Sequence, residues 1–214
     1  MYDTFLFDLD GTLVTMELDF AQIRKKVDAI VVSHRYPESL LDAQMSTLEA
    51  IRTAADYLRI HGMDWKSLKR EADDYLEAVE VEAASKAIPI EGAKGVLKLL
   101  KKEKRKVGII TRNNSNVAWR VLEKSSFSLY VDTVLTRDDV ENVKPHPDHI
   151  LSALRELGST AERTVVVGDH HYEIDAGNAA GCFTVGVLTG SGTKETLKDA
   201  RMIVNSVKDL RKLV

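Results

Sequence analysis

The segment 4–13 reads TFLFDLDGTL and carries the strongest structural signal in this sequence. Its apolar start predicts a strand over residues 4–9 that is buried on both faces, as in a parallel sheet. Asp8 and Asp10 lie at the end of this run, and Gly11 permits a sharp turn that brings both carboxylates to the sheet's carboxyl edge. Burying two acids there is costly unless a cation or hydrogen bonds compensate. The segment therefore predicts an acidic functional site after the first strand.

Short apolar runs like the one at the start of this segment recur along the chain. Short apolar runs bounded by Gly, Asp or Thr predict further strands over residues 106–111, 131–136, 164–168, 184–188 and 202–204. Helical patterns lie between most of them, over residues 93–102, 115–123, 147–157, 173–180 and 207–213. This alternation predicts right-handed βαβ units in a doubly wound, Rossmann-like α/β sheet. Ligands of such sheets bind at the carboxyl ends of the strands.

One segment, from about residue 16 to residue 86, is purely helical in pattern. The first of three expected amphipathic helices has Asp19 as its N-cap. The second ends near Gly62, and Asp64 caps the third. Their apolar stripes, explained by helix–helix packing, are Phe20, Ile23, Val27, Ile30 and Val31; Leu41, Met45, Leu48, Ile51, Ala55 and Leu58; and Trp65, Leu68, Ala72, Leu76 and Val79. We expect a core domain of residues 1–14 and 88–214, and a helical domain of residues 15–87 inserted after the first strand.

Composition limits the possible functions. The chain has 214 residues, 44% of them hydrophobic and 29% charged, so a packed core is expected. A net charge of -3 gives no general attraction to nucleic acid or to acidic membranes. Residues 1–4 lack the basic start of a signal peptide and no apolar run approaches a membrane span, so a cytoplasmic protein is expected. Cys182 is the only cysteine, which excludes an intramolecular disulfide; its apolar neighbours predict that it is buried.

Three further strand ends carry polar residues. Thr111 is followed by Arg112 and Asn113, and Lys144 stands before the helix at 147–157. Gly168-Asp169 ends the strand at 164–168, with Glu173 on the next helical turn. Each has a structural alternative: Thr111 as a helix cap, Lys144 as a surface lysine, and Asp169 with Glu173 as an N-cap and its first-turn partner. The expected topology brings all of them to one edge, with carboxylates for a cation, donors for phosphate oxygens, and one lysine.

In these motifs the sequence resembles the haloacid dehalogenase superfamily, in its phosphoglycolate-phosphatase-like subgroup with a helical cap. The resemblance covers essentially the whole chain. Its four motifs occur in order: Asp8-x-Asp10-Gly-Thr, Thr111, Lys144, and Gly168-Asp169 with an acid four residues on. The ordered set is highly specific, although Thr111 and Lys144 alone are not.

The resemblance implies a magnesium-dependent phosphatase that hydrolyses a small phosphate monoester, phosphoglycolate-like or a sugar phosphate. In it, Asp8 is the nucleophile that becomes an aspartyl phosphate, and Asp10 is the general acid and base. Asp10 then needs a raised pKa, to which the like charges of Asp8 and Asp169 contribute. The catalytic residues are Asp8, Asp10, Thr111 and Lys144; substrate binding falls to Thr111, Arg112, Asn113 and Lys144; Mg²⁺ ligation falls to Asp8, the Asp10 carbonyl, Asp169 and Glu173.

The fourth motif departs from the family pattern. His170 follows Asp169 where the subgroup has a small hydroxyl residue, and Glu173 replaces an aspartate. Glu173 can serve with its longer side chain, through a metal-bound water. His170 and His171 suggest a transition-metal site, but the oxygen-rich surroundings favour magnesium and polar residues at the site rim.

Other functions remain open on the sequence alone. A phosphomutase of the same superfamily shares the first half of the reaction, and a non-catalytic phosphate-binding regulatory module is a third possibility. Asp10 argues against a dehalogenase, because that branch lacks the second acid. The expected partner is a small phosphorylated metabolite, with no nucleic acid and no membrane, for a monomer or homodimer.

Overall fold

The computed structural model describes residues 2–213, which form two compact units. One unit, the core unit, consists of Met1–Met16 and Ala84–Val214. The other, the helical unit, is Glu17–Ala83. Each has its own cluster of buried apolar side chains.

The core unit is built on a six-stranded parallel sheet with the order β5-β4-β1-β6-β7-β8. The chain runs outward from β1 through β4 and β5, then returns to β6 on the other side of β1, which is the Rossmann strand order. The expected doubly wound α/β fold is therefore confirmed. The strands are β1 (Thr4–Phe7), β4 (Lys106–Ile110), β5 (Thr133–Leu135), β6 (Thr164–Gly168), β7 (Phe183–Val187) and β8 (Met202–Val204).

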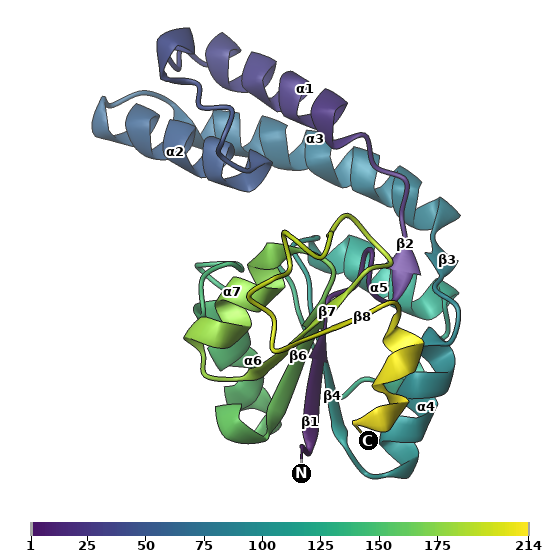
Figure 1. The fold of residues 1–214 in the computed structure, drawn as a ribbon. Helices are drawn as coiled ribbons and strands as arrows, with labels where there is room; N and C mark the ends of the chain where they lie inside the picture. The colour runs from purple at the N-terminus through teal and green to yellow at the C-terminus, as the bar shows by residue number, and fades with distance from the viewer. Residues whose placement is uncertain (1, 214) are drawn as a thin grey trace. The chain divides into compact units, whose positions relative to one another are not determined.

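Helices cover both faces of this sheet (Figure 1). Helices α6 (Asp148–Leu157) and α7 (His171–Ala179), drawn in green, lie on one side; α4 (Ala93–Lys102) and α5 (Ser115–Lys124), in teal, lie on the other. On the α6–α7 side, Leu6 and Val166 of the sheet belong to one apolar cluster with Ile150. Cys182 lies in the same cluster and is buried, as expected.

Short 3-10 helices complete the core unit: η2 (Ser128–Tyr130), η3 (Ala161–Arg163) and η4 (Val207–Lys212). The α-helix expected over residues 207–213 is therefore wrong in type, since η4 is a 3-10 helix that packs on α4. Two short strands were also not expected. Strands β2 (Val14–Thr15) and β3 (Ile88–Pro89) pair antiparallel at the points where the chain leaves and re-enters the core unit. Strands of two residues are too short to show a hydrophobic period.

The helical unit contains α1 (Phe20–Ser33), η1 (Glu38–Leu40), α2 (Thr47–Ile60) and most of α3 (Trp65–Lys86). Asp19 caps α1 as expected, since its side chain accepts a hydrogen bond from the Gln22 N–H at 2.9 Å. The Asp64 carboxylate accepts one from the Ser67 N–H at the start of α3. The predicted stripes meet in one buried cluster that includes Ile23, Val27, Ile30, Ile51, Leu58, Leu68 and Leu76.

Two expectations for the helical unit are wrong. The second helix begins at Thr47 and not near Leu41, because Ser46 and Glu49 form a capping box that fixes its start. Phe20 is 63% exposed and does not belong to the apolar stripe, since it is the first residue of α1. Among residues 2–213, no helix combines the length and the apolar character needed to span a membrane.

Candidate active site

The carboxyl ends of β1, β4 and β6 lie side by side in the sheet. Phe7 of β1 pairs with Ile109 of β4 on one side and with Val167 of β6 on the other. The residues that follow these strands therefore reach one edge together, at the point where the strand order reverses. β1 ends two residues earlier than expected, although the Asp8 N–H still donates to the Val167 carbonyl at 2.9 Å.

Lys144 is the centre of the site. Its side chain is 1% exposed, and its Nζ donates to Asp8 Oδ1 at 2.5 Å, to Glu173 Oε1 at 2.7 Å and to the Ile110 carbonyl at 2.8 Å. Burial alone lowers the pKa of an ammonium group, but the charges of Asp8 and Glu173 outweigh it, so the pKa of Lys144 is raised. Lys144 is a buried, permanent cation, and the alternative of a surface lysine is wrong.

Three buried carboxylates surround this cation. Asp8, Asp169 and Glu173 each offer an oxygen, and these oxygens lie within 4.8 Å of one another. Burial raises the pKa of all three groups; Asp169 adds to the rise at Asp8, and Glu173 adds to it at Asp169. Three acids facing one lysine leave a deficit of positive charge. An all-oxygen donor set of this kind fits a hard divalent cation such as Mg²⁺.

Asp169 is held by a loop after β7 that the sequence analysis missed. Its Oδ2 accepts hydrogen bonds from the N–H and the Oγ of Ser191, at 2.8 and 3.1 Å, and Thr12 Oγ1 donates to Oδ1 at 3.4 Å. A Cβ at Gly190 would lie 2.1 Å from Oδ2, so only glycine fits there. The sequence did contain a signal for this loop, because Thr189-Gly190-Ser191 directly follows the apolar run predicted as a strand over residues 184–188.

Asp10 has the pKa of a group that can exchange protons near neutrality. Burial, followed by the like charges of Asp8 and Asp169, raises the pKa of Asp10 to about 7, against the opposing hydrogen bond from the Met16 N–H at 2.8 Å. The raised pKa agrees with the expectation for a general acid, but its main cause is burial and not the neighbouring charges.

The loop after β4 brings Thr111, Arg112 and Asn113 to the same edge. Thr111 does not cap α5, because Asn114 does so by accepting from the Val117 N–H at 2.9 Å. Instead, Thr111 Oγ1 accepts from the Asn113 N–H at 3.2 Å. Asn113 Nδ2 is buried and has no hydrogen-bond partner within residues 2–213. It is a buried donor without an acceptor among the described residues.

The start of α7 explains the two histidines. His170, not Asp169, is the N-cap: its Nδ1 accepts from the Tyr172 N–H at 3.3 Å, and its N–H donates to Glu173 Oε2 at 2.9 Å. Burial lowers the pKa of His170 to about 4, with smaller contributions from His171 and Arg112. The rings of His170 and His171 lie 4.2 Å apart. These residues therefore build the helix start at the rim of the site.

His149 accepts a hydrogen bond from the backbone N–H of Lys144. The sequence analysis did not single out this residue. It is fully buried; its Nε2 donates to the Leu135 carbonyl at 3.0 Å and its Nδ1 accepts from the Lys144 N–H at 3.4 Å. The acceptor role of Nδ1 needs the neutral ring, and burial, with the nearby charge of Lys144, lowers the pKa of His149 to about 4.

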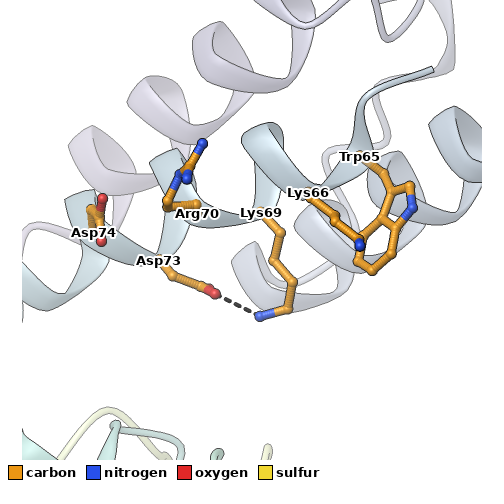
Figure 2. A pocket seen from close by; sticks show the side chains of 6 residues that line it. All are labelled: Trp65, Lys66, Lys69, Arg70, Asp73 and Asp74. Atoms are coloured by element: carbon orange, nitrogen blue, oxygen red, sulfur yellow. Dashed lines mark hydrogen bonds and ion pairs between the residues drawn. The ribbon is translucent and has the colours of Figure 1, made fainter.

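The helical unit has a shallow surface pocket of a different kind (Figure 2). Lys69 pairs with Asp73 at 2.5 Å, and the Lys66 ammonium lies 5.7 Å from the centre of the Trp65 ring. All the lining side chains come from α3, with three cations followed along the helix by two anions. They are Trp65, Lys66, Lys69, Arg70, Asp73 and Asp74.

Comparison with known proteins identifies the family. A profile of the haloacid dehalogenase-like hydrolases matches residues 5–187. Pyrophosphatase PpaX of Bacillus cereus (strain B4264) is 32% identical over 205 residues, which are 94% of this chain and 91% of that protein.

Solved structures share the fold. A β-phosphoglucomutase from Clostridium difficile has a TM-score of 0.69 at 23% identity, covering 98% of this chain and 93% of that one. A predicted phosphoglycolate phosphatase from Haemophilus somnus 129pt has a TM-score of 0.68 at 18% identity, covering 99% of this chain and 97% of that one. As its ordered motifs indicated, the chain belongs to the haloacid dehalogenase-like hydrolase family and is an enzyme of the phosphatase type.

Proposed function

We propose that this protein is a magnesium-dependent phosphatase that hydrolyses a small phosphate monoester through an aspartyl phosphate on Asp8. The observation that carries the proposal is the buried contact of Lys144 with Asp8 and Glu173, beside Asp169. Holding such charges out of water is costly, and a purely structural role does not require three acids around one cation.

In the first half-reaction an Asp8 carboxylate oxygen attacks phosphorus, and the bond between phosphorus and the leaving oxygen breaks. Asp10 donates its proton to that oxygen, so the leaving group departs as an alcohol. With a pKa of about 7, Asp10 is about half protonated at neutral pH, whereas an ordinary aspartate is almost fully ionised. Lys144 holds the Asp8 carboxylate in place and offsets charge on the phosphoryl oxygens.

The second half-reaction reverses the proton's direction. Asp10, now ionised, takes a proton from a water molecule whose oxygen attacks phosphorus. The bond between phosphorus and the Asp8 oxygen breaks, which releases inorganic phosphate and restores both aspartates. One water is consumed for each ester bond cleaved.

The residues that would hold Mg²⁺ are Asp8, Asp169 and Glu173, with the Asp10 carbonyl. Glu173 Oε1 is paired with the Lys144 ammonium and Oε2 accepts from the His170 N–H, whereas the donors to Asp169 are all neutral, so we assign Glu173 a contact through water. When bound, the cation supplies the positive charge that Lys144 alone does not, and it draws charge from the phosphoryl oxygens. The hydrogen bonds from Ser191 and Thr12 would orient the Asp169 carboxylate for binding Mg²⁺.

Donors for the transferred phosphoryl group come from the loop after β4. The Thr111 hydroxyl can donate its hydrogen while it accepts from the Asn113 N–H. The buried, unpartnered Nδ2 of Asn113 gains an acceptor when phosphate binds beside it. Arg112, the residue between them, adds positive charge for the substrate.

Phosphoglycolate-like esters and sugar phosphates remain our candidate substrates, and pyrophosphate joins them. The reason is the 32% identity to a curated pyrophosphatase over nearly the whole chain. Hydrolysis of pyrophosphate would use the same steps, with phosphate as the leaving group.

We also propose that residues 15–87 form a cap domain that selects the substrate. Its support is the position of the insertion in the chain, directly after Asp10-Gly11-Thr12, and the resemblance described above. A site at an open sheet edge needs some element to exclude water and competing esters.

The proposal is tested by Asp8→Asn, assayed with Mg²⁺ on an aryl phosphate, 2-phosphoglycolate, sugar phosphates and pyrophosphate. An amide is not a nucleophile here, so we expect turnover to fall on the order of 10⁴-fold or more while the fold persists. Asp175→Asn, an exposed aspartate on α7, is the matched control. Chelator should abolish wild-type activity, and Mg²⁺ but not Ca²⁺ should restore it. Substantial turnover by Asp8→Asn contradicts the mechanism; product analysis separates hydrolysis from phosphoryl return to a sugar.

A further inference from the structure

His149 is a fully buried histidine in the first turn of α6, and the mechanism above does not use it. Its two ring nitrogens have partners of opposite kind. Nδ1 lies 3.4 Å from the backbone nitrogen of Lys144, which can only donate, and Nε2 lies 3.0 Å from the Leu135 carbonyl, which can only accept. These partners fix the tautomer, so the ring is neutral and carries its hydrogen on Nε2.

The surroundings of the ring favour this neutral form. Burial, followed by the charge of Lys144, lowers the pKa of His149 to about 4, and the charge of Arg112 acts in the same direction. The hydrogen bond to the Leu135 carbonyl and the charge of Asp139 oppose this shift and do not outweigh it. Nδ1 therefore remains an acceptor for the Lys144 N–H at neutral pH.

The Leu135 carbonyl, at the end of β5, is a shared acceptor. It accepts from His149 Nε2 at 3.0 Å and from the Thr111 N–H at 2.9 Å, which uses both of its lone pairs. Because the Thr111 N–H alone would satisfy this carbonyl, the ring is not needed to give it a partner. The ring instead connects the backbone of Lys144 to the carbonyl that holds the backbone of Thr111.

Lys144 is thereby held at both ends of its side chain. Its ammonium donates to two carboxylates and to the Ile110 carbonyl, and its backbone N–H donates to His149. Ile110 and Leu135 are paired neighbours in β4 and β5, so the two ends of the lysine are anchored on adjacent strands. A lysine side chain is a flexible four-carbon stem, and fixing both ends keeps its ammonium in one place.

We propose that His149 is a positioning residue that sets the separation between Lys144 and Thr111 in the active site. It does so directly at the Lys144 backbone, and at Thr111 through the shared Leu135 carbonyl. This inference rests on the proposed function, in which Lys144 holds the nucleophile and Thr111 binds the phosphoryl group. A displaced lysine slows the attack on phosphorus, and a displaced threonine weakens the binding of phosphoryl oxygens.

The first test is His149→Leu, which removes both contacts and keeps an apolar side chain in the buried position. The readouts are kcat and KM on p-nitrophenyl phosphate with Mg²⁺, and the affinity for inorganic phosphate measured by calorimetry with Mg²⁺. We expect kcat to fall about tenfold or more and phosphate to bind several times more weakly, because small displacements of catalytic groups are costly.

Two half-replacements separate the two contacts. His149→Asn places an amide oxygen near the position of Nδ1 and keeps the acceptor for Lys144, whereas His149→Gln reaches the position of Nε2 and keeps the donor to Leu135. We expect His149→Asn to recover most of the kcat lost in His149→Leu, and His149→Gln to recover most of the affinity for phosphate. A merely structural role of the ring predicts no such split.

Leu154→Ala is the matched control, since it removes a buried apolar side chain from the same helix and from the apolar cluster that contains Leu135. It should lower the stability measured by urea denaturation and leave kcat within about twofold of the wild type, because it removes no hydrogen bond.

The inference is overturned if His149→Leu keeps the wild-type kcat, or if Leu154→Ala loses as much kcat as His149→Leu. Should His149→Leu fail to fold, the half-replacements decide, and equal kcat and equal phosphate affinity in His149→Asn and His149→Gln would overturn it. Failure of the wild type to hydrolyse p-nitrophenyl phosphate with Mg²⁺ would instead contradict the proposed function itself.

Discussion

The two units of the molecule differ in where they place most of their charge. In the core unit, Lys144, Asp8 and Glu173 are buried together and bound to one another. In the helical unit, the buried cluster is apolar, and ion pairs such as Lys69–Asp73 lie on the surface. Buried charge is costly and surface charge is not, so the difference separates a region shaped by chemistry from one whose interior is explained by packing.

Among changes that compare the two units, the largest effect is expected from Lys144→Met, which keeps most of the length of the side chain and removes its charge. Two buried carboxylates lose their cation, and breaking a buried pair from one side costs about 3–5 kcal/mol. We expect the free energy of unfolding to fall by about 3 kcal/mol and turnover by on the order of 10³-fold or more. Urea denaturation and steady-state kinetics measure both.

The matched change in the other unit is Lys69→Met. Its partner Asp73 is also exposed, so the same loss of charge should cost less than about 0.5 kcal/mol. Adding Glu173→Gln to Lys144→Met should restore part of the stability, because it removes one uncompensated carboxylate. Equal costs for the two lysine substitutions would break the contrast between the units.

The next effect concerns what the helical unit contributes. Replacing residues 17–83 with a short Gly/Ser linker should lower kcat/KM on a preferred metabolite by about 10²-fold more than on a small aryl phosphate, since remote contacts supply binding energy in the transition state. A circular-dichroism spectrum that retains the α/β signal is the control. Equal losses on both substrates would mean that the insertion supports the fold and does not read the substrate.

The same contrast explains what the sequence could predict. Asp8, Thr111 and Asp169 were found because each lies at the end of an apolar run, and parallel strands bring such positions to one edge. Lys144 was found because it stands before a predicted helix, in order with the other motifs. The helical stripes were found because packing imposes a 3.6-residue period. Both signals are local and periodic.

What the sequence did not reveal depends on contacts between distant residues. The stack of Arg112 on Tyr172 and the support of Asp169 by Ser191 join residues far apart in the chain, and no spacing encodes them. The start of α2 is a different case. Ser46 and Glu49 show a capping-box signature that a local reading could have used.

A smaller effect is expected at Ser191, which sharpens the account of the acidic cluster. Ser191→Ala removes the Oγ donor to Asp169 and keeps the backbone donor, so Asp169 loses part of its orientation. Residues behind metal ligands typically contribute 10–100-fold in affinity, and we expect about tenfold weaker Mg²⁺ binding by calorimetry. Thr193→Ala, on the same loop and without a described contact to Asp169, is the control. An unchanged Mg²⁺ affinity in Ser191→Ala would mean that Ser191 stabilises the loop and does not orient Asp169 for metal binding.

A further effect is a pH dependence of stability from His149. Its pKa is lowered from 6.5 to about 4 in the folded protein, so the neutral ring contributes fully to stability above pH 6.5, and this contribution is lost progressively as pH falls from 6.5 to 4. Between pH 7 and 4.5 the wild type should lose about 2 kcal/mol more than His149→Gln, which does not titrate. Parallel pH profiles of the two proteins would contradict this origin.

The central claim is that the phosphoryl group passes through Asp8, and trapping the intermediate tests it most directly. The substrate is p-nitrophenyl phosphate, whose leaving group departs as a stable anion and needs little help from an acid. Asp10→Asn should then permit the first half-reaction and slow the second, because water loses its base. Acid quenching and peptide mass spectrometry should find one added phosphoryl group on the peptide that contains Asp8, and none in Asp8→Asn/Asp10→Asn. A phosphoryl group on another residue, or its absence while the wild type turns over, would contradict the account.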